Sequence, residues 1–293
     1  MKSKIVWIAS YPKSGNTWLR LLLANYFFGF QKPILPNELG NYIIADTNPR
    51  LYFDYAKIMG LEFKVVSNDY SLRNAALKFY LNKSPNVFMK THTAFHFKDN
   101  IPFFDDKISG FFIYIVRDPR DVLVSLAHHN LGGQLFKKHQ AGVGGKIDNY
   151  ELTLILDAMS SKNENLIEPE SGSPQHLSSW DNHVNGFRDL NKNVLFLRYE
   201  DLITDVEGCF IDLIVSLTGQ YEDKKILKAI NNSKFTTLQK YEKKFAFKEN
   251  ISSDSKFFRS GKIGSWKKFD NQNIFRKLEK RFGETMDRIG YKV

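Results

Sequence analysis

A lysine, two hydroxyl residues and a glycine stand together in the segment Lys13-Ser14-Gly15-Asn16-Thr17, between an apolar run and a longer run of helix-forming residues. A turn of this kind directs the free N–H groups at the start of a helix toward one point, where they can bind an anion. Lys13 adds a positive charge, Ser14 and Thr17 add hydroxyl donors, and Gly15 allows a close approach of the backbone. The segment therefore predicts an anion site. A capped helix beside an exposed lysine is the simpler alternative.

The residues around this turn predict a strand at residues 5–9 and a helix at residues 18–28, with Asn16 or Thr17 as the helix cap. The turn is not the ordinary nucleotide-binding loop, which needs a glycine, four residues and then Gly-Lys-Ser/Thr. Here the lysine precedes the glycine. A kinase or NTPase of the P-loop type is therefore an alternative and not the first interpretation.

A second polar cluster, Lys90-Thr91-His92, follows an apolar run at residues 86–90. A histidine at the end of a strand can act as a general base, because its ordinary pKa lies near neutrality. A hydrogen-bonded loop histidine is the alternative. His96 follows four residues later, so a metal-binding pair is conceivable. No carboxylate or cysteine accompanies the two histidines, and we therefore expect no metal.

A third cluster begins with Arg117, at the end of an apolar run at residues 111–116. Asp118 can cap the helix expected at residues 119–129, and Ser125 lies about two helical turns further on. An arginine at a strand tip with a hydroxyl nearby suits a phosphate group, because a guanidinium can donate two parallel hydrogen bonds. The cluster predicts a second anion site.

Two other interpretations of this cluster stay open. One is a surface ion pair of Arg117 or Arg120 with Asp121. The other is a strand whose aspartate, Asp118, holds magnesium in a nucleotide-hydrolysing enzyme. Capping accounts for Asp118 without a metal.

Two further clusters lie in the second half of the chain. Tyr199 follows an apolar run at residues 194–198 and offers a face for a purine base, although packing is the usual role of such a tyrosine. The segment Arg259-Ser260-Gly261-Lys262 is a basic loop in which glycine allows backbone N–H groups to converge on an anion. Together the clusters predict two separate anion sites, an aromatic platform and one histidine.

Strand-like and helix-like runs alternate along the chain, which predicts an α/β fold with a central parallel sheet flanked by helices, in a single domain over residues 1–293. Ligands on such sheets bind beyond the carboxyl ends of the strands, where the polar clusters stand. Further helices are expected at residues 150–159, 176–189, 206–218 and 273–289. The stretches 31–54 and 131–147 are expected as loops; the second, rich in glycine, suggests a lid or a disordered segment.

The chain has 293 residues and a net charge of +10, from 42 Lys and Arg against 32 Asp and Glu. This balance suits an anionic ligand, and a non-catalytic protein that binds polyanions is a third class to consider. The single cysteine, Cys209, excludes an internal disulfide framework and a cysteine-rich zinc site. No signal peptide is visible, and the apolar stretch 19–30 is too short to span a bilayer, so we expect a soluble, cytoplasmic protein without membrane insertion.

Five segments resemble those of the cytosolic-type sulfotransferases, which use 3′-phosphoadenosine 5′-phosphosulfate (PAPS). They are YPKSGNTW, VFMKTH, IVRDPRDVLVS, LFLRYEDL and FFRSGKIGSW, in the order and approximate spacing of the family. With the residues that flank them they span residues 5–269. The resemblance implies a P-loop NTPase-like sulfotransferase fold and transfer of a sulfuryl group to a hydroxyl or an amine. It does not specify the acceptor, which we expect to be a small molecule or a glycan and not a nucleic acid.

The resemblance also assigns roles to individual residues. The implied contacts of the 5′-phosphosulfate are Lys13, Ser14, Gly15, Asn16 and Thr17. The implied contacts of the 3′-phosphate are Arg117, Ser125, Arg259, Ser260 and Gly261. The implied contacts of the adenine are Trp18, Tyr199, Ser233 and Phe235. For catalysis it implies His92 as the base, with Lys13 and Lys90 as supporting cations.

The implied reaction is an in-line transfer. By analogy with phosphoryl transfer its transition state is loose, so positioning and charge stabilisation dominate. Lys13 is expected to stabilise the charge on the leaving oxygen, and His92 to remove the proton of the acceptor. Because a sulfuryl group carries less charge than a terminal phosphate, we expect the reaction to need no metal.

Some residues depart from the family pattern. Ser260 stands where the family usually has lysine, which puts the 3′-phosphate clamp in question, and Lys262 is a candidate to compensate. Ser265 replaces the usual aspartate before Trp266, and the chain that follows lacks the dimerisation motif of animal members, so no dimer is assumed. We also expect the chain to lack the leading segment that helps form the acceptor pocket in animal enzymes. That pocket is expected from residues 35–64 and the glycine-rich stretch, with WDNHVNGF nearby.

Overall fold

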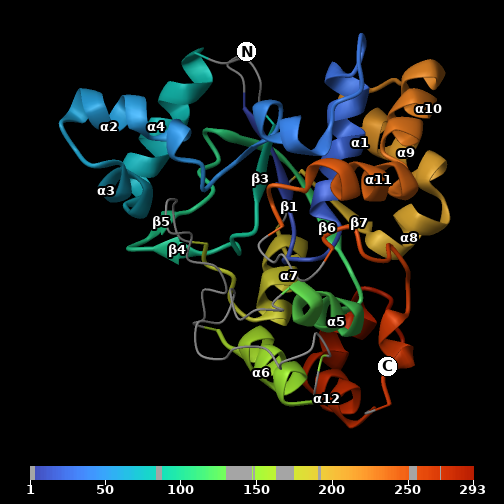
Figure 1. Ribbon diagram of the computed structural model, residues 1–293. Coiled ribbons are helices and arrows are strands. Elements are labelled where there is room, and N and C mark those ends of the chain that lie inside the picture. Colours follow the sequence, from blue (N-terminus) through green and yellow to red (C-terminus); the bar gives the residue numbers. More distant parts are fainter. Residues whose placement is uncertain are drawn as a thin grey trace.

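The strands expected from the sequence lie side by side in one parallel sheet (Figure 1). The computed structural model describes residues 4–83, 88–129, 147, 149–162, 175–190, 193–250, 256–270 and 272–293. Within these residues, the larger sheet has five strands, in the order β2 (Ile44–Ala45), β3 (Phe88–Thr91), β1 (Ile5–Ala9), β6 (Ser109–Val116) and β7 (Val194–Arg198). The α/β class is confirmed, and β2 is a strand that the sequence did not predict.

The central strands divide their side chains between two hydrophobic cores. Trp7 on β1 and Tyr114 on β6 belong to one core, whereas Ile8 and Ile113 belong to the other, and all four are fully buried. This division follows from the pleat of a strand, which points successive side chains to opposite faces. Each large apolar side chain buried in this way contributes about 1.5–3 kcal/mol. A parallel sheet with both faces covered is the result.

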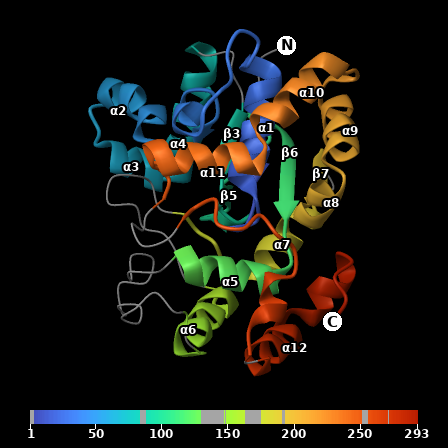
Figure 2. The same cartoon turned by 45° about the vertical axis from the view of Figure 1, so that its right-hand side comes forward.

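Helices cover each face (Figures 1 and 2). The core that includes Ile8 is completed by α1 (Asn16–Phe28), α8 (Tyr199–Thr204), α9 (Val206–Thr218), α10 (Asp223–Asn232) and α11 (Phe235–Phe245). The core that includes Trp7 is completed by α2 (Phe53–Met59), α3 (Phe63–Asn68), α4 (Tyr70–Lys83), α5 (Pro119–His129), α6 (Asn149–Ser160), α7 (Trp180–Arg188) and α12 (Asn273–Arg288). In Figure 2 the arrow of β6 points toward α5 and α7.

The sequence suggested a plain loop at residues 31–54, but the structure has regular elements there. It contains the 3-10 helices η1 (Pro36–Asn41) and η2 (Pro49–Leu51), the strand β2 and the start of α2. The side chain of Asn25 ties the stretch to α1, because its amide accepts from the Ile34 N–H at 3.0 Å and donates to the Ile34 carbonyl at 3.2 Å. A long-range side-chain anchor therefore orders a segment whose prolines suggested an irregular path.

Other bounds differ from expectation in smaller ways. Helix α7 begins at Trp180 and not at residue 176. A short antiparallel pair, β4 (Phe97–Lys98) and β5 (Ile101–Pro102), follows β3, and the 3-10 helix η3 (Ser265–Lys268) precedes α12. Apart from residue 147, the glycine-rich stretch 131–147 lies outside the described residues. No helix in the described part of the chain is long and apolar enough to cross a membrane.

Candidate active site

The turn after β1 has a backbone that few residue types adopt. Lys13 has a φ of 66° and Gly15 a φ of 101°, both in the left-handed region. At Gly15 a glycine is required, because an added Cβ would lie 2.5 Å from a ring carbon of Tyr199. Lys13 has no such freedom, and a non-glycine residue in this region costs about 1–3 kcal/mol. Strain of this size at a lysine in a turn is typical of a functional site.

The start of α1 differs from the sequence prediction. The residue at the N-cap is Gly15, and no side chain caps the helix, so neither Asn16 nor Thr17 is its cap. The amide of Asn16 instead donates to the Ile8 carbonyl at 3.1 Å and to Ser10 Oγ at 3.2 Å. Asn16 thus fixes the turn to the end of β1, and the N–H groups of the first helical turn are not covered by a cap.

Thr17 contacts an internal carboxylate. Its hydroxyl donates to Glu249 Oε2 at 3.3 Å, and Arg20 binds the same carboxylate at 2.7 Å. Burial raises the pKa of Glu249, but Arg20 and Lys90 outweigh it and lower that pKa to about 2. A negative charge is therefore held at the entrance of the candidate anion site. Sequence reasoning did not identify Glu249.

Burial lowers the pKa values of two lysines in this cluster. Burial, and next the charge of Arg117, lowers the pKa of Lys13 to about 7, and its ammonium lies 4.0 Å above the ring of Phe257. Burial also lowers the pKa of Lys90, opposed by the attraction of Glu249. Cations kept away from water in this way interact strongly with an anion that enters the site.

His92 lies at the end of β3 with its ring held in one orientation. Its Nδ1 is 2.8 Å from the carbonyl oxygen of Ser10. Because a carbonyl only accepts, Nδ1 carries the proton, and Nε2 keeps its lone pair. Burial, and next the charge of Lys90, lowers the pKa of His92 well below its ordinary value. The ring is neutral at pH 7, as a base must be before it takes a proton.

A second histidine, His183 of α7, lies behind His92. It is fully buried, and its Nε2 is 3.0 Å from the His92 carbonyl, while its Nδ1 is 2.8 Å from the hydroxyl of Tyr114. The sequence prediction placed WDNHVNGF, which contains this histidine, near the acceptor pocket. His183 shares the buried face of α7 with Trp180 and Phe187. This spacing was the signal in the sequence that His183 belongs to the core.

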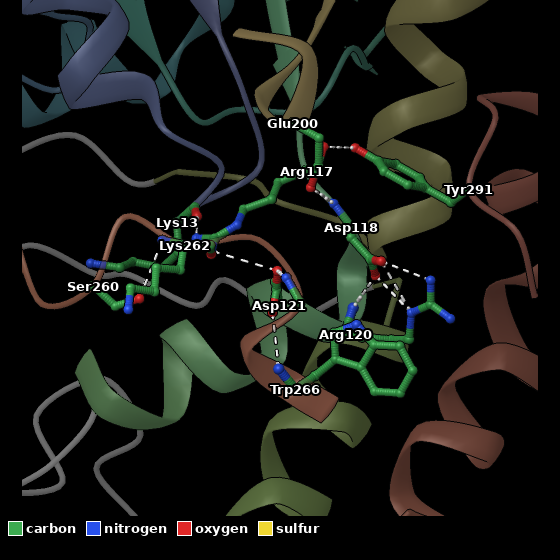
Figure 3. Close-up of polar contacts among 11 residues, drawn as sticks. Lys13, Arg117, Asp118, Arg120, Asp121, Glu200, Ser260, Lys262, Trp266 and Tyr291 are labelled. Carbon is green, nitrogen blue, oxygen red and sulfur yellow. Dashed lines mark hydrogen bonds and ion pairs between the residues drawn. The ribbon is translucent and has the colours of Figure 1, made fainter. Parts of the chain in front are cut away.

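Arg117 joins three segments (Figure 3). Its guanidinium donates to the carbonyls of Lys13 at 3.3 Å and Lys262 at 3.1 Å. It also lies 4.6 Å above the ring of Tyr199. The tips of β1, β6 and β7 are thereby connected to the loop before η3. Arg117 Nε is buried and has no hydrogen-bond partner in the described part of the chain.

Asp121, the aspartate of the predicted surface ion pair, is buried and binds backbone N–H groups. Asp121 accepts from the N–H groups of Gly264 at 2.7 Å and Trp266 at 3.1 Å, and it is 3.8 Å from Arg117 (Figure 3). Asp121 is 1% exposed, so the predicted ion pair with Arg117 is present but buried, and only its expected place at the surface is wrong. Asp121 anchors the basic C-terminal loop to α5.

The predicted role of Asp118 as a helix cap is confirmed. Its carboxylate accepts from the Arg120 N–H at 2.9 Å and also binds the Arg120 guanidinium at 2.7 Å. Arg120 reaches Glu279 of α12 at 2.6 Å as well. Both carboxylate oxygens of Asp118 are therefore engaged by protein donors.

Aromatic residues lie beside the two anion clusters. The Trp18 indole N–H donates to the Ser233 carbonyl at 3.0 Å, and its ring is 6.1 Å from that of Tyr199. The ring of Phe235 closes against Gly261, where an added Cβ would lie 2.8 Å from it. The structure thus brings the four predicted adenine contacts and the C-terminal loop together.

The C-terminal loop adds a second guanidinium. Burial, and next the charge of Arg117, lowers the pKa of Arg259, so the two arginines lie close enough to repel each other. Like charges held together favour a bound anion. Ser125, on α5, is half-buried. Ser260 accepts from the Lys262 N–H at 3.2 Å and helps shape the loop.

Orphaned donors mark both anion clusters. The hydroxyls of Ser14 and Ser233 are buried and have no hydrogen-bond partner in the described residues, as is also true of Arg117 Nε. A buried polar group without a partner is costly, and native proteins usually satisfy it with a ligand, an ion or water. These donors fit a ligand with anionic groups at two ends. Across the described residues, no cluster of three or more His, Cys, Asp or Glu is arranged to hold a metal.

Comparisons with known proteins agree with this geometry. The family model described as "Sulfotransferase domain" matches residues 3–290. The chain is 26% identical to cytosolic sulfotransferase 8 of Arabidopsis thaliana over 297 residues, which cover 98% of this chain and 78% of the relative. It is 22% identical to an amine sulfotransferase of Oryctolagus cuniculus over 292 residues, which cover 96% and 80%.

Solved structures show the same fold. A crystal structure of retinol dehydratase with androsterone and the inactive cofactor PAP matches with a TM-score of 0.65 at 19% identity, over 98% of this chain and 82% of that one. A mouse sulfotransferase complexed with PAP matches with a TM-score of 0.60 at 20% identity, over 97% and 84%.

Proposed function

This chain belongs to the sulfotransferase family, and on that premise we propose that it transfers the sulfuryl group of PAPS to a hydroxyl or amine of a small molecule or glycan. One observation carries the choice of donor. Arg117 binds the Lys13 turn and the Lys262 loop while it lies over Tyr199. Both cationic clusters therefore meet at Arg117 beside the Tyr199 ring, which suits an adenine nucleotide that carries two phosphate-bearing groups.

We propose that three groups of residues bind three different parts of this donor. The Lys13 turn, with Ser14, Gly15 and Thr17, would hold the 5′ end. Arg117 and Arg259 would hold the 3′-phosphate, with Ser125, Ser260 and the backbone at Gly261 beside them. Trp18, Tyr199, Ser233 and Phe235 would enclose the adenine. When bound, the donor supplies an activated sulfuryl group whose leaving group is a phosphate.

The protein groups would then carry the chemistry. Lys13 would stabilise charge at the leaving oxygen, and the anionic ligand would raise its pKa from about 7 and keep it protonated. His92 Nε2, unprotonated because Nδ1 faces Ser10, would take the proton of an acceptor placed in line. Lys90 would support the developing charge. With two cations supplied by the side chains of Lys13 and Lys90, we propose a reaction that needs no metal.

Binding of the donor requires Glu249 to give way. Thr17 and Arg20 hold the Glu249 carboxylate at the position proposed for the 5′ end. A phosphate there would compete for the same donors, and two negative charges in contact repel each other. We therefore propose that nucleotide binding exchanges one anion for another.

Two alternatives are set aside. A kinase or NTPase is not retained, because the chain belongs to the sulfotransferase family and Asp118, its candidate magnesium ligand, is engaged by Arg120. A non-catalytic polyanion binder is not retained either, since the relatives are named as sulfotransferases. The names of the cytosolic relatives also support our proposal of a cytoplasmic location.

The donor is tested by calorimetry and by turnover. We expect adenosine 3′,5′-bisphosphate (PAP) to bind at least about 10-fold more tightly than adenosine 5′-monophosphate, because charged hydrogen bonds contribute about 1.5–3 kcal/mol each. With PAPS and a panel of phenols, alcohols, amines and glycans, turnover should persist in EDTA and be lost in Lys13→Ala and His92→Ala. Equal affinity for the two nucleotides would remove the basis for PAPS as donor.

A further inference from the structure

The carbonyl of His92 is held by a buried pair of side chains that the reaction itself does not use. His183 and Tyr114 are both fully buried. His183 Nε2 lies 3.0 Å from the His92 carbonyl oxygen, and the Tyr114 hydroxyl lies 2.8 Å from His183 Nδ1. The three groups form one chain from the strand β6 through the helix α7 to the candidate base.

The direction of these hydrogen bonds is determined by chemistry. A carbonyl oxygen only accepts, so His183 Nε2 must donate, and in a neutral ring Nδ1 must then accept from the Tyr114 hydroxyl. Burial lowers the pKa of His183 to about 4, which keeps its ring neutral near pH 7. Burial raises the pKa of Tyr114 well above its ordinary value, so its hydroxyl keeps the proton it donates.

His92 needs this support because it lies beyond the sheet. A backbone hydrogen bond of 3.4 Å runs from the N–H of Ser10, which follows β1, to the carbonyl of Thr91, the last residue of β3. The strand β3 ends at Thr91, one residue earlier than the base. The carbonyl of His92 is thus held by a side chain where a strand residue would have a backbone partner.

We infer that His183 and Tyr114 are positioning residues that fix the main chain of His92, so that its ring can bind Ser10 through Nδ1 and direct Nε2 to the acceptor. The inference rests on the proposed function, in which His92 is the base. Neither residue has a role in nucleotide binding. Their effect should therefore appear in turnover and in the tautomer of His92, and not in the affinity for PAP.

The main variant is His183→Leu, which keeps the bulk of the side chain and removes the donor. We expect kcat to fall about 10- to 100-fold, because small displacements of a catalytic group are costly. The dissociation constant of PAP should change less than about twofold. In His183→Gln the amide nitrogen lies near the position of Nε2 and can donate to the same carbonyl, so most of the loss should be restored. Tyr114→Phe, which removes one hydroxyl, should lower kcat less than His183→Leu.

Nitrogen NMR gives a readout that does not depend on activity. In the wild-type protein near pH 7, His92 should show a protonated Nδ1 and an unprotonated Nε2. In His183→Leu we expect a mixture of tautomers at His92. Val184→Ala is the matched control, because Val184 is fully buried on the same helix, and its loss should lower the melting temperature while kcat and the tautomer stay unchanged.

The outcomes separate this inference from the proposed function. If His92→Ala abolishes turnover while His183→Leu retains both kcat and the single tautomer, the positioning role is wrong and the proposed function stands. If His92→Ala retains turnover with PAPS, the proposed base is wrong, and the tautomer result alone then decides whether His183 orients this ring. If His183→Leu and Val184→Ala weaken the binding of PAP to the same extent, and His92 keeps a single tautomer in both variants, the role of His183 is purely structural.

Discussion

Arg20 and Glu249 form a 2.7 Å ion pair at the place where the first helical turn can accept an anion. Arg20 is 1% exposed, whereas one third of the Glu249 side chain reaches the surface. The same carboxylate accepts from Thr17. The protein therefore carries its own anion at the entrance of the proposed 5′ site, and the pair couples stability to ligand binding.

This coupling predicts opposite effects in Glu249→Gln. Without nucleotide, the buried guanidinium loses its counter-charge, and we expect the free energy of unfolding to fall by about 1–3 kcal/mol. PAP should bind several-fold more tightly, because no carboxylate has to be displaced. Thermal unfolding and calorimetry measure the two quantities. Asp54→Asn, which removes an exposed pair with Lys83, is the control and should change neither. Weaker binding of PAP in Glu249→Gln would contradict this prediction.

Arg117 predicts a loss that depends on the ribose phosphate. Arg117→Ala should weaken PAP by about 10- to 100-fold, since charged hydrogen bonds to phosphate are lost. Adenosine 5′-monophosphate, which lacks the 3′-phosphate, should lose much less. Titration calorimetry of both ligands gives the comparison, and Arg281→Ala, which removes the ion pair with Asp181, is the control. An equal loss for both nucleotides would assign Arg117 to the scaffold alone.

Gly15 predicts a steric and a conformational cost. Gly15→Ala places a Cβ 2.5 Å from the Tyr199 ring at a φ of 101°, so the turn or the ring must shift. We expect the protein to be destabilised by about 1–3 kcal/mol and to bind PAP more weakly. Gly40→Ala is the matched control, because nothing lies within 4 Å of an added Cβ there. Unfolding in denaturant measures the stability, and equal stability of the two variants would show that the turn adapts freely.

The pKa of Lys13 predicts that binding takes up a proton. In the free protein this pKa is lowered to about 7, so at about pH 8 the amine is mostly neutral. Two phosphates nearby would raise it, and the complex should hold one more proton than its components. Affinity for PAP should consequently fall as the pH rises above 7. Calorimetry in buffers of different ionisation enthalpy measures the uptake.

The lowered pKa of Lys13 also predicts how the stability of the free protein depends on pH. Because the folded state lowers the pKa of Lys13, the unfolded chain binds more protons between about pH 7 and pH 10.5, and this residue makes stability rise with pH over that window. Lys13→Met should remove the share of Lys13 in both the rise and the proton uptake, and leave only the smaller share of Lys90, whose pKa is also lowered by burial. Lys32→Met, at an exposed lysine, should retain them. Proton uptake that persists undiminished in Lys13→Met would place the titration at another group.

Local patterns in the sequence were sufficient for much of the fold. The bounds of β1, β7, α5 and α9 match the predicted ranges. Each element is a continuous run of strand-forming or helix-forming residues, and a residue at its border favours the end of the element. The role of Asp118 as a helix cap was also predictable from local sequence, because the N–H group that it caps belongs to Arg120, two residues away. Apart from Ser233 and Phe235, the predicted contacts of the donor came from five motifs in family order, and the structure gathers them at one edge of the sheet.

Short helices with few apolar residues were missed. Helix α11 has one buried residue, Leu238, and α8 is only six residues long. Such segments have little helical tendency of their own and form because they dock on a core that is assembled elsewhere.

The sequence by itself determined which chemical groups stand at the ends of the strands, and hence the kind of ligand they suit. Only the tertiary structure decided which of these groups meet. Thr17 and Glu249 are 232 positions apart, and His183 and His92 are 91 apart. Contacts of that range depend on how helices pack against the sheet, and no periodicity within a segment records them. The charge next to the anion site and the support behind the base were therefore visible only in the folded chain.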